Sequence, residues 1–68
     1  MTTGRYVIHQ LNAEGVCWRE YTKWVHSPDG YDLMVERVQR GFTMAHTGLT
    51  GPTGEVVLGT APKHEPAV

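Results

Sequence analysis

The chain has 68 residues, a formal net charge of −1, four histidines and one cysteine. A chain of this length allows one small domain, its single cysteine excludes an internal disulfide, and its charge provides no basic surface for nucleic acid. No apolar run approaches the roughly 20 residues that cross a membrane, and the first residues, MTTGRYV, lack the apolar core of a signal peptide, so we expect a soluble, cytoplasmic protein.

Two strands joined by a tight turn are predicted near the N-terminus. Residues 5–11, RYVIHQL, and residues 16–23, VCWREYTK, are rich in strand-forming residues. Between them, Asn-Ala-Glu-Gly at residues 12–15 has the composition of a type I turn closed by a bulge glycine. The second segment has a helical alternative, since one side of a helical wheel would carry Cys17, Trp18, Tyr21, Trp24 and Val25. We favour the strand, because a helix would enclose Gly15 and leave the first strand without a partner.

The length of this turn predicts the register of the hairpin. With a three-residue loop, one face carries the pairs Leu11 with Cys17, His9 with Arg19, and Val7 with Tyr21. The other face carries the pairs Gln10 with Trp18, Ile8 with Glu20, and Tyr6 with Thr22. We expect Trp18 to lie under a helix together with Tyr6 and Ile8.

Residues 27–41, SPDGYDLMVERVQRG, carry the signals of an amphipathic helix. Its apolar stripe consists of Tyr31, Met34, Val35, Val38 and the trailing Phe42. Ser27 is suited to the N-cap, Pro28 to the first helical position, and Gly41 to the left-handed conformation that ends many helices. The alternative is a turn at residues 27–30 between long strands at 16–26 and 31–39, but polar and apolar residues alternate poorly over the second of these.

The C-terminal part predicts a second hairpin. Residues 42–47, FTMAHT, and residues 55–59, EVVLG, are expected to be strands, with a glycine-bounded turn at 51–54 before the last one. The fold class is therefore α+β: a ββαββ unit in which one amphipathic helix covers one face of a four-stranded antiparallel sheet. We expect a single domain at residues 1–60 and a flexible tail at 61–68. This element order is similar to that of many short bacterial and phage proteins, and no residue motif indicates a family.

The histidines and the cysteine lack the spacing of a metal motif. They are His9, Cys17, His26, His46 and His64, without a CxxC, HxxxH or HExxH pattern. A catalytic thiol would require Cys17 with a lowered pKa and a histidine, His9 or His46, within hydrogen-bond reach. A cysteine in the middle of a strand is instead typical of an inert, buried side chain. We therefore predict no cofactor, no metal and no enzyme activity.

The predicted arrangement of one helix on a four-stranded sheet favours a binding function. One helix covers only one face of the sheet, so the expected register leaves an apolar patch on the other face. The interface residues predicted for a second copy of the chain, or for another protein, are Val7, Leu11, Arg19, Tyr21 and Lys23. The alternative is a nucleic-acid-binding module, whose basic and aromatic residues would be Arg5, Arg19, Lys23 and Tyr21. A membrane partner is not expected.

Overall fold

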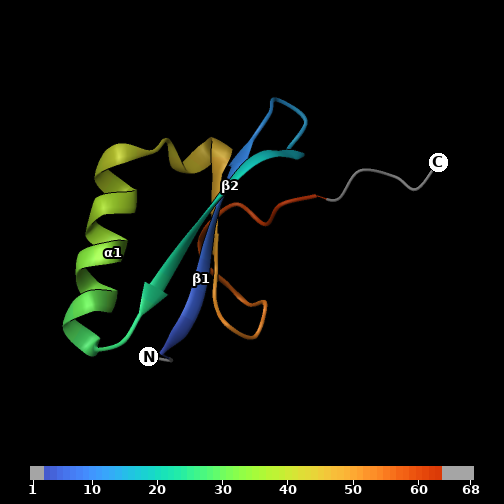
Figure 1. Ribbon diagram of the computed structural model, residues 1–68. Coiled ribbons are helices and arrows are strands. Elements are labelled where there is room, and N and C mark those ends of the chain that lie inside the picture. The colour runs from blue at the N-terminus through green and yellow to red at the C-terminus, as the bar shows by residue number, and fades with distance from the viewer. Residues whose placement is uncertain (1–2, 64–68) are drawn as a thin grey trace.

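The computed structural model describes residues 3–63, and it has the predicted ββαββ order (Figure 1). The elements are β1 (Gly4–Leu11), β2 (Cys17–Val25), α1 (Pro28–Gly41), the 3-10 turn η1 (Met44–His46), β3 (Thr47–Thr50) and β4 (Val56–Gly59). The four strands form one antiparallel sheet in the order β2-β1-β3-β4. The α+β fold class is therefore confirmed, with one α-helix within residues 3–63.

The turn of the first hairpin has the predicted form. Gly15 has a φ of 82°, which favours glycine, and its N–H donates to the Asn12 carbonyl at 3.0 Å. The Asn12 side chain holds the loop, since its Oδ1 accepts from the N–H of Glu14 at 2.9 Å and from that of Val16 at 3.0 Å. The sequence of these four residues thus determines the turn locally.

The register beyond that turn differs from the prediction. Leu11 pairs with Cys17 as expected, but Gln10 pairs with Arg19 and His9 with Glu20, because a β-bulge inserts Trp18 as an extra residue in β2. A shift of one residue moves every later side chain of a strand to the opposite face. The predicted pairs from Gln10 to Tyr6 are therefore wrong, although the strands themselves are confirmed.

The helix begins and ends at the predicted residues, but the backbone conformation at its C-terminus differs from the prediction. Ser27 is the N-cap, its Oγ accepting from the Gly30 N–H at 3.1 Å, and Pro28 follows at the first position. Gly41 was expected in a left-handed conformation, but it is the last helical residue and is not among those with positive φ. The helix ends because Phe42 is extended, with φ −131° and ψ 150°, while its N–H still bonds the Val38 carbonyl.

The core lies between α1 and one face of the sheet. Its buried members are Tyr6, Ile8, Val25, Met34, Val38 and Leu49. Met34 and Val38 come from the predicted apolar stripe, and burying each stabilises the fold by about 1.5–3 kcal/mol. Tyr6 and Ile8 are under the helix as predicted, whereas Trp18 is 61% exposed, so its assignment to the core is wrong. The bulge is the reason, because it places Trp18 outside the regular alternation of the strand.

The strand predicted at residues 42–47 is replaced by a crossing connection. The chain passes through η1 and enters β3 only at Thr47, and β3 then pairs with β1 from Thr47 opposite Gln10 to Thr50 opposite Val7. The physical reason is topological: β3 lies beside β1, so the chain must first cross from the helix to the middle of the sheet. The following turn and the strand β4 agree with the prediction, and the Gly54 N–H donates to the Gly51 carbonyl at 3.0 Å.

The chain continues along the sheet after β4. The Thr60 N–H donates to the Thr47 carbonyl at 2.9 Å, and the Lys63 N–H donates to the Gly15 carbonyl at 2.9 Å, where Val16 and Lys63 form a parallel bridge. Gly48 permits this crossing, since a Cβ there would lie 2.2 Å from the Thr60 carbonyl oxygen. Lys63, within the predicted tail, thus takes part in main-chain pairing, and residues 64–68 of that tail lie outside the described residues.

Candidate functional site

The strand β2 is the most exposed regular element of the described chain. It is at one end of the sheet order, so within residues 3–63 its outer side has no strand neighbour. Every residue from Trp18 to Trp24 is exposed, and Trp18 and Trp24 themselves are 61% and 62% exposed. An edge strand of this kind presents unpaired N–H and C=O groups to solvent. Main-chain and aromatic groups are therefore both available for binding along this edge.

Basic and aromatic side chains occupy the helix side of β2. Tyr21 pairs with Ile8 and Lys23 with Tyr6, both of which are core residues under α1. The guanidinium carbon of Arg19 lies 5.0 Å from the centroid of the Tyr21 ring, a cation–π distance. The same ring packs against Phe42 at a centroid separation of 6.1 Å. The Tyr21 ring is therefore held by two neighbours, one of them charged.

The predicted nucleic-acid set is divided between the two faces. Arg5 pairs with Trp24 on the side away from α1, whereas Arg19, Tyr21 and Lys23 are on the helix side. The shared face predicted for these four residues is therefore wrong, and the bulge is again the cause. Three of the four still form one row along β2.

The predicted apolar patch is largely removed from solvent. Val7 and Leu11 are on the face away from α1 as expected, but they are only 8% and 4% exposed. The segment after β4 crosses this face from Gly48 to Val16 and covers part of it. Tyr21, assigned to the same patch, lies on the helix side. The expected set of interface residues is thus brought together only for Arg19, Tyr21 and Lys23.

Trp18 lies beside an open groove at the end of α1. The residues that line this groove are Gln10, Leu11, Trp18, Gly41, Phe42, Thr43, His46 and Thr47. The groove joins the bulge of β2 to the crossing connection that precedes β3. A large exposed aromatic beside a groove is a common feature of binding surfaces, so Trp18 extends the exposed strip of β2 toward the helix terminus.

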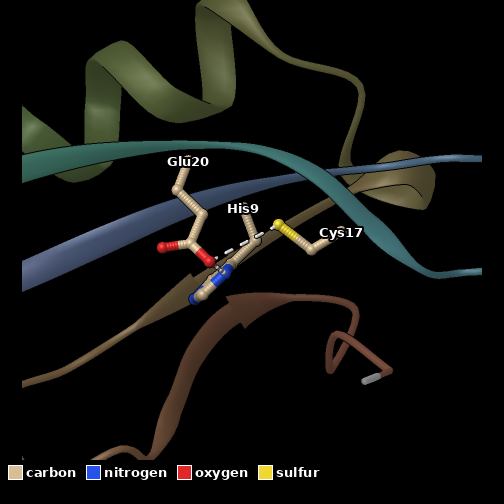
Figure 2. A group of neighbouring side chains, drawn as sticks. All are labelled: His9, Cys17 and Glu20. Atoms are coloured by element: carbon tan, nitrogen blue, oxygen red, sulfur yellow. Dashed lines mark hydrogen bonds and ion pairs between the residues drawn. The ribbon is translucent and has the colours of Figure 1, made fainter. Parts of the chain in front are cut away.

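A second cluster lies on the face away from α1, where His9, Cys17 and Glu20 approach one another (Figure 2). His9 Nδ1 is 3.8 Å from Glu20 Oε1, and Cys17 Sγ is 3.9 Å from the same oxygen. The ligand atoms of the three residues all lie within 4.8 Å of one another. His9 Nε2 is hydrogen-bonded to Thr50 Oγ1 at 2.8 Å, which fixes the orientation of the ring.

The environment of Cys17 favours the thiol over the thiolate. Burial raises the pKa of the Cys17 thiol, and the neighbouring Glu20 carboxylate raises this pKa further. A backbone hydrogen bond at Arg19 lowers this pKa and so acts in the opposite direction. Because only the thiolate is strongly nucleophilic, a thiol with a raised pKa is a poor attacking group by itself.

Glu20 and Thr50 were not predicted as neighbours of His9 and Cys17. Residues 17 and 20 would lie on opposite faces of a regular strand, and only the bulge at Trp18 places them on the same one. Thr50 is 41 residues from His9 in sequence and reaches it through the pairing of β1 with β3. A histidine opposite a glutamate in a corrected hairpin register was the signal that could have revealed the cluster.

No protein-family model matches the chain, and comparisons with curated proteins and with solved structures gave no match. Within residues 3–63, no helix is both long and apolar enough to cross a membrane.

Proposed function

We propose that this chain is a non-catalytic protein-binding module that forms a homodimer by antiparallel pairing of the β2 strands of two copies. The observation that supports it is the nine-residue edge strand β2, exposed at every position from Trp18 to Trp24. Addition of a strand to such an edge satisfies main-chain groups of both partners. The proposed compartment is the cytoplasm, where a free thiol such as that of Cys17 is kept reduced.

Side-chain complementarity favours one register of this pairing. In a continuous antiparallel sheet, residues directly opposite each other lie on the same face, and a two-fold axis relates the two strands. With the axis at Thr22, Tyr21 lies opposite Lys23 of the second copy, and the threonines face each other. Two symmetric contacts between an aromatic ring and an ammonium group result, and each is favourable.

The neighbouring register is less favourable. With the axis at Tyr21, Arg19 would lie opposite Lys23 of the second copy, twice in each dimer. Like charges directly opposite each other destabilise a sheet. The axis at Thr22 avoids this repulsion and keeps Arg19, Tyr21 and Lys23 within the interface, while the buried Val7 and Leu11 lie outside it.

A nucleic-acid-binding function is the second candidate. The row formed by Arg19, Tyr21 and Lys23 supports it, because basic residues interleaved with an aromatic suit single-stranded nucleic acid. The contacts of the Tyr21 ring with Arg19 and Phe42 leave less of it available for a base. The net charge of −1 also offers little counterion release, so we place this function second.

A charge exchange at Thr22 tests the dimer and its register together. Thr22 is exposed, so substitution should not alter the core. We expect the native chain to sediment as a dimer at micromolar concentration, and the Thr22→Glu and Thr22→Lys variants to sediment as monomers, because like charges then meet at the axis. An equimolar mixture of the two variants should restore the dimer as a heterodimer.

The matched control is Gln39→Glu, a change at an exposed position on α1 that should leave the dimer intact. A native chain that is monomeric under these conditions would contradict the homodimer. Dimers that survive both Thr22 variants would place the interface elsewhere. Salt-sensitive binding of single-stranded nucleic acid by a monomer, weakened in Lys23→Gln, would instead support the second candidate.

A further inference from the structure

The β-bulge in β2 builds a three-residue cluster from two strands. His9 comes from β1, and Cys17 and Glu20 come from β2 on either side of the inserted Trp18 (Figure 2). Without the bulge, the thiol and the carboxylate would lie on opposite faces of the sheet. β-bulges are over-represented beside functional sites, where they redirect a side chain. Here the redirected side chain is Glu20.

The distances within the cluster are close to those that a metal ion imposes. Tetrahedral zinc, with bond lengths of ~2.0–2.3 Å, separates its nitrogen, sulfur and oxygen ligands by ~3.3–3.6 Å. The Nδ1–Oε1 and Sγ–Oε1 distances are 3.8 and 3.9 Å. The ligand atoms of the third pair, His9 and Cys17, lie within 4.8 Å of each other, so closing the cluster around an ion takes small movements of the Cys17 thiol and of the Glu20 side chain, which is 60% exposed.

The histidine has the second contact that metal-binding histidines require. Ligating imidazoles almost always bond through their other ring nitrogen, which fixes both the ring orientation and the tautomer. With Nε2 protonated and donating to Thr50 Oγ1 at 2.8 Å, the Nδ1 lone pair is directed at Cys17 and Glu20. Thr50 belongs to β3, so the orientation is set by the sheet itself.

We infer that His9 Nδ1, Cys17 Sγ and Glu20 Oε1 form a binding site for a divalent transition metal of the zinc type, with a fourth position open to solvent. A thiolate, a carboxylate and a neutral imidazole carry two negative charges, which balance the two positive charges of the ion. Binding forms the metal–sulfur bond as the thiol S–H bond breaks, and the proton passes to the solvent. The thiolate donor favours zinc or cobalt over magnesium or calcium, which prefer oxygen ligands alone.

Titration of the full-length, untagged chain with Co²⁺ and Zn²⁺ tests the site. We expect one ion per chain, a near-ultraviolet sulfur-to-cobalt charge-transfer absorption, and loss of this absorption when Zn²⁺ displaces Co²⁺. Isothermal titration calorimetry in two buffers of different ionisation enthalpy should register the released proton. The same results are expected in the Thr22→Glu variant, so the metal site is tested independently of the proposed dimer.

Two variants test proposed ligands, a third tests the residue that orients the histidine, and a fourth is the control. Cys17→Ser should abolish the charge-transfer absorption, and His9→Gln should remove tight binding. Thr50→Val, which removes only the contact to Nε2, should weaken binding about 10- to 100-fold. The control is His26→Gln, a change at an exposed histidine outside the cluster, which should bind as the native chain does. Circular dichroism of each variant establishes that the fold is retained.

Two outcomes would overturn the assignment. The first is absence of a charge-transfer absorption in the folded native chain with Co²⁺ in excess. The second is binding that persists in folded Cys17→Ser and His9→Gln variants but is lost in His26→Gln, which would place the ion at another histidine.

Discussion

The two edges of the sheet are built differently. β2 has nine residues and is exposed from Trp18 to Trp24, whereas β4 has four and its middle residues, Val57 and Leu58, are half-buried against the core. β4 ends at Gly59, whose φ of 77° turns the chain so that Thr60 bonds back to Thr47. A short edge that turns away offers little template for pairing, whereas a long one offers a continuous row of groups.

This difference separates stability from binding. Within the described chain, Val25 is the one residue of β2 that is buried, while β1, β3 and α1 supply the rest of the core. The other β2 side chains therefore contribute little to the hydrophobic core and can be selected for recognition. We infer that mutations in the centre of the sheet affect folding and that mutations along β2 affect association.

The largest expected effect comes from comparing the stability of a variant in the centre of the sheet with that of a variant along β2. Leu49 on β3 is fully buried, so Leu49→Ala should lower the free energy of unfolding by about 2–5 kcal/mol. Trp24→Ala on β2 removes a larger side chain that is 62% exposed, and it should change this free energy by about 0.5 kcal/mol or less. Urea denaturation in the monomeric Thr22→Glu background measures both changes without a contribution from association.

In the native background, Trp24→Ala should instead weaken the dimer, because Trp24 lies opposite Glu20 of the second copy in the proposed register. A loss of stability in the Trp24 variant as large as that in the Leu49 variant would show that β2 is part of the core. The distinction between the two edges would then fail.

An intermediate effect is expected at the crossing that follows β4. Gly48→Ala places a Cβ 2.2 Å from the Thr60 carbonyl oxygen, so the crossing segment must move, and we expect a loss of about 1–3 kcal/mol. Gly41→Ala is the matched control, because a Cβ there has nothing within 4 Å and lies at the end of α1. That change should be neutral or stabilise the fold by up to about 1 kcal/mol. Thermal unfolding measures the stability of both variants. Equal losses of stability in the two variants would contradict the close crossing of the chain over Gly48.

The elements that the sequence predicts correctly are those whose boundaries are determined by a few neighbouring residues. Ser27 and Pro28 define the start of α1, and the two turns have glycines where φ becomes positive, at Gly15 and Gly54. These features depend on local sterics and hydrogen bonds, which the sequence states directly. The helix ends at Gly41 as predicted, but the left-handed conformation expected there is wrong, because Phe42 adopts an extended backbone as it packs toward Tyr21, and that contact joins separate elements.

The register could not be predicted because a bulge depends on tertiary packing. Both registers form the same turn and the same strands, and they differ in which β2 side chains face α1. The observed register places Tyr21 against Phe42 and leaves Trp18 outside the core. The candidate metal cluster was missed for the same reason, because Cys17 and Glu20 share a face only through the bulge.

The smallest expected effect is a pH dependence of stability, located in the turn that precedes β4, the short edge strand of the sheet. In the turn before β4, Glu55 Oε2 accepts hydrogen bonds from the Thr53 hydroxyl and from the Thr53 N–H, the second at 3.1 Å. The bond from the hydroxyl is the main cause that lowers the pKa of the Glu55 carboxyl. A lowered pKa in the folded state means that the unfolded state binds a proton at Glu55 first as the pH falls. The contribution of Glu55 to the stability of the fold is therefore complete above the ordinary glutamate pKa of ~4.3 and is lost as pH falls through the folded pKa.

Thr53→Val removes the hydroxyl and keeps the N–H, so the Glu55 pKa should rise and the acid-induced loss of stability at this residue should shrink. Carbon-detected NMR titration of the Glu55 carboxyl measures the shift, and Thr22→Val on β2 is the control that should leave it unchanged. A Glu55 pKa that is the same in the native and Thr53→Val chains would show that the hydroxyl does not stabilise the carboxylate, and that the turn is held by its main-chain bonds, Gly51 N–H to Glu55 carbonyl at 2.8 Å among them.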